Sequence, residues 1–148
     1  MSGITIGQLP CAYQQEIAQK CDKNRDGKLT GNEITIFEQQ KDEFGGNRNV
    51  SNNGNNWTIK EDHGDGSTST TQIRKNENGT TVSTWQGGDI SYHCTFDKNG
   101  IKRSETYHDG AHTSFESWDQ NGNPIVSTRV DAADEEIPED GTNFDVEG

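Results

Sequence analysis

Oxygen-bearing residues recur at alternate positions between residues 22 and 33, which is the spacing of a loop that wraps around a metal ion. Gly27 allows the sharp turn that such a loop needs, and Glu33 can close the shell with both carboxylate oxygens. Hard oxygen donors in this number favour Ca²⁺ over softer metals. We therefore predict a calcium site whose ligands are Asp22, Asn24, Asp26, the backbone carbonyl of Lys28, Thr30 through a water, and Glu33.

Helices on both sides of the loop must hold these ligands in place. Apolar residues recur at helical spacing before the loop, after a proline at position 10 that suits a first turn, and again after the loop. The recurring residues are Tyr13, Ile17, Ala18 and Cys21, then Ile34, Phe37 and Phe44. With the loop pattern D-x-[DN]-x-[DN]-G-x5-E, residues 11–44 resemble an EF-hand, which implies a helix-loop-helix unit that binds calcium.

EF-hands generally occur in pairs, which are joined by a short strand contact through the apolar residue at the eighth loop position, here Leu29. The nearest candidate for a second loop, residues 62–66, lacks alternating oxygens and a closing Glu, so it is better interpreted as a hairpin turn. Leu29 therefore needs another partner. That partner lies either in the rest of this chain or in a second copy, and the second choice would make a homodimer through the unpaired loop.

Composition limits the classes of partner. The net charge is −12 and only 26% of residues are hydrophobic, so the chain can build only a thin core. Residues 131–148 contain eight acids and no base, which predicts an acidic, flexible tail. No basic stripe could neutralise phosphates, so nucleic acid is not an expected partner. No apolar run is long enough to cross a bilayer, and residues 1–10 lack the pattern of a secretory signal, so no membrane association is expected.

The second half of the chain contains turn-forming residues at the regular spacing of a repeated hairpin. Residues 45–56 are rich in Asn and Gly and predict a linker between the calcium unit, residues 1–44, and the repeats, residues 57–130. Turn-forming groups alternate in two series, each recurring about every 22 residues. One series begins at Asn76, Asp97 and Asp119, and the other lies at residues 64–66, 87–89 and 108–110. The spacing predicts an antiparallel meander of about seven strands, so the expected fold class is α+β.

Alternation along these strands predicts which face of the meander is buried. Ile90, Tyr92, Cys94 and Phe96 point to one side. Pairing Tyr107 with Ala111 would place four more residues there, namely Ile101, Tyr107, Ala111 and Phe115. Trp118 breaks the parity with Phe115, which predicts a bulge or a reset of register near the Asp119 turn. We expect the two helices to dock on this face, or two copies of the chain to cover each other in this way, because the helices are the other apolar surface of the chain.

Three segments place an aromatic residue a few positions before a turn glycine: residues 96–102, 107–110 and 118–123. These segments resemble the units of MORN-like and YD-type bacterial repeats, and the resemblance extends over residues 57–130. It implies a structural or partner-binding sheet and, in some MORN-like members, a proposed antitoxin role.

Histidines and acids do not assemble an enzyme site in the sequence. His93 and His112 are expected on the polar face about 11 Å apart, which is too far for one zinc ion. His63 and His108 fall in turns. A glycan-cleaving site around Trp85, His93 and His112 would lack the pair of acids that such chemistry uses. We therefore expect no enzymatic activity.

Three cysteines are too few, and odd in number, for a disulfide scaffold. Cys11 and Cys21 would lie about 15 Å apart along one helix, whereas a disulfide needs α-carbons within about 7 Å. Either could pair with Cys94, or all three could remain buried thiols.

These features favour two functions. The first is a calcium-binding interaction protein whose helices dock on a repeat-built sheet that binds a protein or glycan. The second is an antitoxin-like or adaptor protein whose acidic tail binds a basic protein, with calcium incidental. A lone loop with three carboxylates binds calcium weakly, which slightly favours an extracellular or lumenal setting, while the absence of a signal pattern favours the cytoplasm.

Overall fold

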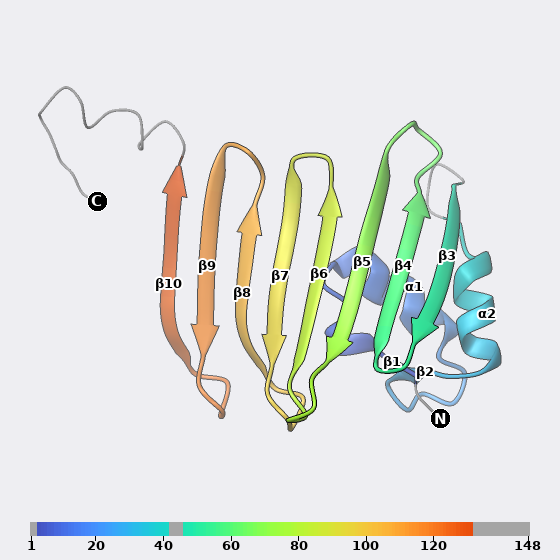
Figure 1. Ribbon diagram of the computed structural model, residues 1–148, viewed down its shortest axis with the longest axis horizontal. Coiled ribbons are helices and arrows are strands. Elements are labelled where there is room, and N and C mark those ends of the chain that lie inside the picture. The colour runs from blue at the N-terminus through green and yellow to red at the C-terminus, as the bar shows by residue number, and fades with distance from the viewer. Residues whose placement is uncertain (1–2, 42–45, 132–148) are drawn as a thin grey trace, which may run out of the picture.

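The computed structural model describes residues 3–41 and 46–131 of the 148-residue chain. Its main element is an eight-stranded antiparallel sheet, residues 47–131, in which every strand pairs with its neighbours in sequence. Two helices and a two-stranded ribbon lie on one face of this sheet, behind and beside its N-terminal strands in Figure 1. The expected α+β class and the antiparallel meander are therefore confirmed. The predicted acidic tail lies outside the described residues.

Short connections join successive elements along the described chain. The N-terminal part consists of β1 (Ile4–Thr5), η1 (Ile6–Gln8), α1 (Ala12–Cys21), β2 (Lys28–Leu29) and α2 (Asn32–Gln39). The large sheet consists of β3 (Asn47–Asn53), β4 (Asn56–Asp62), β5 (Thr68–Lys75), β6 (Thr81–Gly87), β7 (Ile90–Phe96), β8 (Lys102–His108), β9 (His112–Trp118) and β10 (Pro124–Asp131). None of the described helices is long and apolar enough to span a membrane.

The first helix begins two residues later than a first-turn proline would require. Cys11 is the N-cap of α1 and Ala12 its first residue, so Pro10 lies outside the helix. The Gln15 side chain donates to the Leu9 carbonyl at 2.8 Å, and this bond fixes the chain as it enters the helix. The predicted helix-loop-helix arrangement of α1, loop and α2 is present in the structure.

The segment predicted to be a linker is instead an edge strand of the sheet. β3 pairs with β4 through the register Arg48↔Glu61 and Val50↔Ile59, so the large sheet has eight strands rather than about seven. The Asn-rich composition gave no strand signal, because only Arg48 and Val50 of its seven residues are buried or half-buried. Gly54 adopts φ +66° in the two-residue connection to β4, which is the backbone that tight hairpins require.

The repeated turns share one hydrogen-bonding design. Asp97 Oδ1 accepts from the backbone N–H groups of Asn99 and Ile101 at 2.9 and 3.0 Å. Asp119, one repeat later, accepts in the same way from Asn121 and Asn123. These backbone bonds lower the pKa of both carboxyls. The residues that gave the repeat its sequence signature are therefore the residues that close its hairpins.

The predicted side-chain faces are right for β7 and wrong for β9. Tyr92 pairs with Tyr107 across β7 and β8, so these rings share a face as expected. Tyr107, however, pairs with Ser114 rather than Ala111, and Phe115 lies opposite Thr106 on the other face. The predicted pairing was displaced by an odd number of residues, and such a shift moves every side chain of a strand to the opposite face. The expected bulge is present, as a register shift between Pro124 and Val126.

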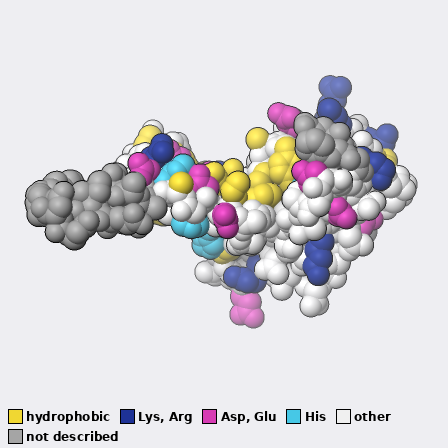
Figure 2. All heavy atoms as spheres, turned by 90° about the horizontal axis from the view of Figure 1, so that it is seen from above, with side chains coloured by type: hydrophobic (Ala, Val, Ile, Leu, Met, Phe, Trp, Pro, Cys, Tyr) yellow, Lys and Arg dark blue, Asp and Glu magenta, His cyan; other side chains and the backbone are white. Residues whose placement is uncertain are grey.

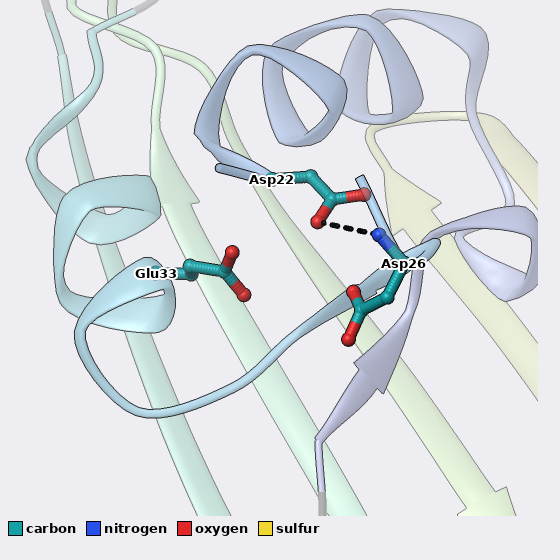
Figure 3. A group of neighbouring side chains, drawn as sticks. All are labelled: Asp22, Asp26 and Glu33. Carbon is teal, nitrogen blue, oxygen red and sulfur yellow. Dashed lines mark hydrogen bonds between the residues drawn. The ribbon is translucent and has the colours of Figure 1, made fainter. Parts of the chain in front are cut away.

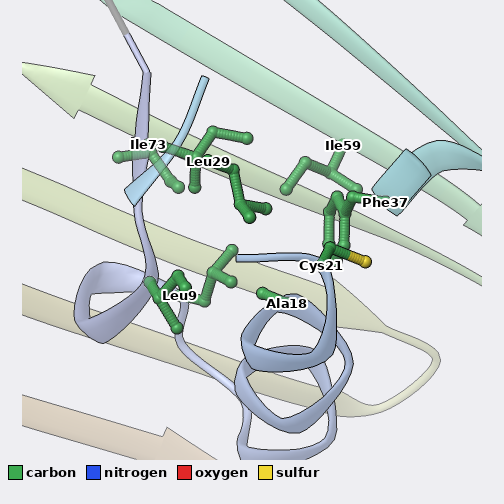
Figure 4. Close-up of a cluster of buried hydrophobic side chains, with 9 residues drawn as sticks. Leu9, Ala18, Cys21, Leu29, Phe37, Ile59 and Ile73 are labelled. Carbon is green, nitrogen blue, oxygen red and sulfur yellow. The ribbon is translucent and has the colours of Figure 1, made fainter. Parts of the chain in front are cut away.

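The core lies between the helices and the β3–β7 part of the sheet. Figure 4 shows this cluster, in which residues of the helices and loop pack with Ile59 and Ile73 of the sheet. The buried members are Ile4, Ile6, Leu9, Ala18, Cys21, Leu29, Phe37, Ile59 and Ile73. Cys11, Cys21 and Cys94 are buried free thiols. The helices thus dock on the face that was expected, but over strands nearer the N-terminus, and no described helix lies behind β8–β10 (Figure 1).

Candidate metal centre

Three carboxylates converge between α1 and α2. Asp22 directly follows α1, Asp26 lies in the loop, and Glu33 belongs to the first turn of α2. One carboxylate oxygen from each lies within 4.8 Å of the others, and Figure 3 shows the three side chains around a common space. Calcium binds oxygens at about 2.3–2.6 Å, so two ligands on opposite sides of one ion are about 5 Å apart. The spacing of the three carboxylates therefore fits a single calcium ion.

Backbone hydrogen bonds fold the loop around this space. Gly27 N–H donates to Asp22 Oδ2 at 2.8 Å, and Lys28 N–H donates to Asp26 Oδ1 at 3.0 Å. Gly27 itself has φ +81°, a backbone conformation that favours glycine. The local sequence therefore determines the loop shape, because the acidic side chains accept hydrogen bonds from backbone N–H groups two to five residues further along the chain.

Glu33 joins the two ends of the loop. One of its carboxylate oxygens accepts from the N–H of Lys23 at 2.8 Å, and the other accepts from the N–H of Thr30 at 3.1 Å. The residue is only 8% exposed. A carboxylate oxygen has about two acceptor positions, so each oxygen that binds an N–H retains one for a metal.

The other predicted ligands lie on the same loop, outside the three-carboxylate group. Asn24 Oδ1 accepts from the N–H of Asp26 at 3.3 Å, beside an Asp22 oxygen that accepts from the same group. Lys28 lies in β2, and Thr30 follows that strand. The structure brings together Asp22, Asp26 and Glu33, and it places Asn24 next to them through this shared N–H.

Leu29 has its strand partner within the same chain. β2 pairs antiparallel with β1 through the register Ile4↔Leu29, and both side chains are buried, at 1% and 0% exposed. Ile6 N–H also donates to the Gly27 carbonyl at 3.0 Å. The N-terminal segment therefore occupies the side of the loop at which paired EF-hands contact each other, so the partner of Leu29 lies in the same chain. No residue near Leu29 in the sequence indicates this contact.

A buried polar network connects both helices to the sheet. Glu61 of β4 accepts hydrogen bonds from Tyr13 Oη at 2.6 Å and Gln14 Nε2 at 3.0 Å, both of α1. Arg48 of β3 forms an ion pair with Glu61 at 2.9 Å and donates to the carbonyls of Phe37 and Gln40 at the end of α2. Sequence analysis missed this network, because its members lie far apart in the chain.

The histidines do not form a common site. His93 and His112 lie on opposite faces of the sheet, since His93 pairs with Thr106 and Thr106 with Phe115, whereas His112 has the parity of Tyr107. The expectation that they share the polar face was wrong, for the same register reason as at Phe115. His112 lies beside Asp109 at 3.4 Å and Tyr107 at 5.6 Å between ring centroids.

Comparisons with models of protein families, with curated proteins and with solved structures gave no match for this chain. The likeness to EF-hands and to MORN-like repeats therefore rests on the residues described above, and both stay predictions.

Proposed function

We propose that this chain is a calcium-binding interaction protein, in which the ion stabilises a helical layer and the sheet contacts a protein or glycan partner. The observation that supports calcium is the convergence of Asp22, Asp26 and Glu33 within 4.8 Å on a loop closed by its own backbone bonds. Asn24, the Lys28 carbonyl and Thr30 would supply the remaining oxygens. The ion would offset repulsion among three carboxylates and hold α1 against α2.

The role proposed for calcium is structural. The helices that flank the loop already bond to the sheet through Glu61 and Arg48, so an ion between them would strengthen an existing layer. A single loop with three carboxylates belongs with the weaker calcium sites, which fill at about 10⁻⁴–10⁻³ M calcium. This affinity range favours an extracellular or lumenal setting.

Calorimetric titration with calcium tests the assignment. Wild-type protein should bind one ion, and Glu33→Gln and Asp22→Ala should each abolish binding or weaken it strongly, because each removes a charge and a ligand oxygen. Glu16→Gln is the matched control, since Glu16 is an exposed acid on α1 outside the loop. Unchanged binding in both loop variants would show that the ion, if bound, lies elsewhere.

The second candidate is an antitoxin-like or adaptor role. It is favoured by the eight acids and the absence of bases in residues 131–148, a segment that could attach to a basic protein. Capture of a defined basic partner with equal strength in calcium and in chelator, and its loss on removal of residues 132–148, would favour this role over the first.

A further inference from the structure

A row of aromatic rings crosses four strands on the face that also contacts the helices. It consists of Trp85 in β6, Tyr92 in β7, Tyr107 in β8 and His112 in β9. Successive ring centroids are 5.8, 5.0 and 5.6 Å apart. All four side chains are half-buried, so the row has both packed and solvent-facing surface.

The row begins beside the helical layer, at Trp85, and continues to β8 and β9, which no described helix covers. Trp85 Nε1 donates to the hydroxyl of Tyr13 in α1 at 3.1 Å, and this bond fixes the first ring. Tyr107 Oη donates to Asp109 at 3.2 Å near the other end. Figure 2 shows hydrophobic side chains at the surface between the helical part of the molecule and the uncovered strands, with acidic side chains beside them. Rings held in this way lose little entropy when a partner binds.

Several acidic residues lie around the row, and the Arg129 side chain, on the same face of β10, pairs with Asp131 at 3.0 Å. Glu105 and Glu116 lie directly opposite each other on the same face of β8 and β9, and Asp89 lies in the β6–β7 turn next to Gly110. Lys102 forms an ion pair with Glu105. Within residues 3–41 and 46–131, no side chain forms an ion pair with Glu116 or Asp89. The face therefore holds carboxylates that are not neutralised locally.

Sheet stability alone explains only part of this arrangement. Cross-strand aromatic pairs stabilise an antiparallel sheet, and they suit strands that lack a helical cover. Like charges directly opposite each other destabilise a sheet, and Lys102 pairs with Glu105 but not with Glu116. The Glu116 carboxylate therefore faces Glu105 without an ion-pair partner among the described residues. A cation bound over the rings would contact both features, because aromatic faces and carboxylates attract positive charge.

We propose that the row formed by Trp85, Tyr92, Tyr107 and His112 is the docking surface for a basic, arginine- and lysine-containing segment of a protein partner. Guanidinium and ammonium groups would stack on the rings and pair with Glu116, Asp89 and Asp109. A second copy of this chain, with net charge −12, or its own acidic tail would be repelled from the same face. The inference rests on the proposed role of the sheet as an interaction surface and does not require calcium.

Fluorescence anisotropy with a labelled oligo-arginine peptide tests this surface, using an uncharged Gly-Ser peptide of equal length as the probe control. Tyr107→Ala should weaken binding about tenfold, which corresponds to one lost cation–π contact of about 1.4 kcal/mol. Phe115→Ala is its matched control, because Phe115 lies on β9 on the opposite face. Glu116→Lys should also weaken binding at least several-fold, whereas Glu77→Lys, a matched reversal in an exposed turn, should have a much smaller effect.

The charge reversals decide the question even if Tyr107→Ala unfolds, because both replaced glutamates are exposed. Equal weakening by Glu116→Lys and Glu77→Lys would mean general attraction to an acidic protein and would overturn the proposal. So would the absence of peptide binding, or binding of a neutral chito-oligosaccharide that depends on Tyr107 while the peptide does not bind. Calcium titration of the same samples separates the two ideas, since intact calcium binding without peptide binding contradicts the docking surface alone.

Discussion

At the scale of single residues, Glu61 joins the two layers of the molecule. Its carboxylate accepts from Tyr13 and Gln14 of α1 and from Ser69 of β5, and it pairs with Arg48, which in turn caps the end of α2. Glu61 and Arg48 are almost fully buried, so each charge is stabilised by its partner and not by water. Removing one member leaves the other charged and without its partner, which is far more costly than losing a surface pair.

Glu61→Gln should therefore lower the free energy of unfolding by about 3–5 kcal/mol, because Arg48 loses its counter-charge in a buried position. Urea denaturation followed by tryptophan fluorescence measures this loss. Glu77→Gln, an exposed turn residue, should change stability by less than about 0.5 kcal/mol. Equal effects of the two substitutions would contradict the role given to the buried pair.

The buried thiols predict an alkaline limit to stability. Burial, followed by the nearby Glu61 carboxylate, raises the pKa of Cys11 from 9.0 to about 12, and burial raises that of Cys94 to about 11. The unfolded chain would lose these protons at lower pH than the folded chain. The contribution of the two thiols to the free energy of unfolding is therefore fully present below pH 9.0 and is lost as the pH rises toward about 11 and about 12. Denaturation curves for wild type and Cys11→Ala should converge as pH rises through this range, and parallel curves would refute the assignment.

At the scale of elements, local chemistry was predictable and distant pairing was not. The loop around Asp22 and the hairpins at Asp97 and Asp119 follow from side chains that bond to backbone only a few residues away. The wrong face for Phe115 came from the length of one hairpin connection, which composition does not determine. The β1–β2 pairing could not be predicted either, because nothing near Ile4 marks Leu29 as its partner.

The ribbon of β1 and β2 is expected to support both the core and the metal-binding loop. Ile4→Ala should destabilise the fold by about 2–5 kcal/mol, because it opens a cavity beside Leu29 in the core. It should also weaken calcium binding, since β1 supports the second half of the loop. Thermal denaturation and calorimetry measure the two effects. Ile90→Ala is the control, because Ile90 is 36% exposed; a loss of stability with unchanged calcium affinity would show that β1 does not support the loop.

At the scale of the whole molecule, one continuous sheet has two different environments. The β3–β7 part contains the buried residues that pack against the helices, while side chains of β8 and β9 are mostly half-buried and those of β10 mostly exposed. β10 is also an edge strand, so one row of its backbone groups has no strand partner among the described residues. Local opening should therefore require least free energy at β10 and most in the strands under the helices.

Calcium should change the free energy of local opening only in those strands that contact the helices. An ion that binds the folded loop stabilises it by mass action, by about 2.7 kcal/mol when calcium is at a hundredfold excess over its dissociation constant. Glu61 and Arg48 connect the flanking helices to β3 and β4, so amide exchange there should slow in calcium relative to chelator. Exchange in β9 and β10 should change little, because no described helix covers them. If calorimetry shows a filled loop while exchange in β3 and β4 is identical in both conditions, the metal centre and the sheet are energetically independent.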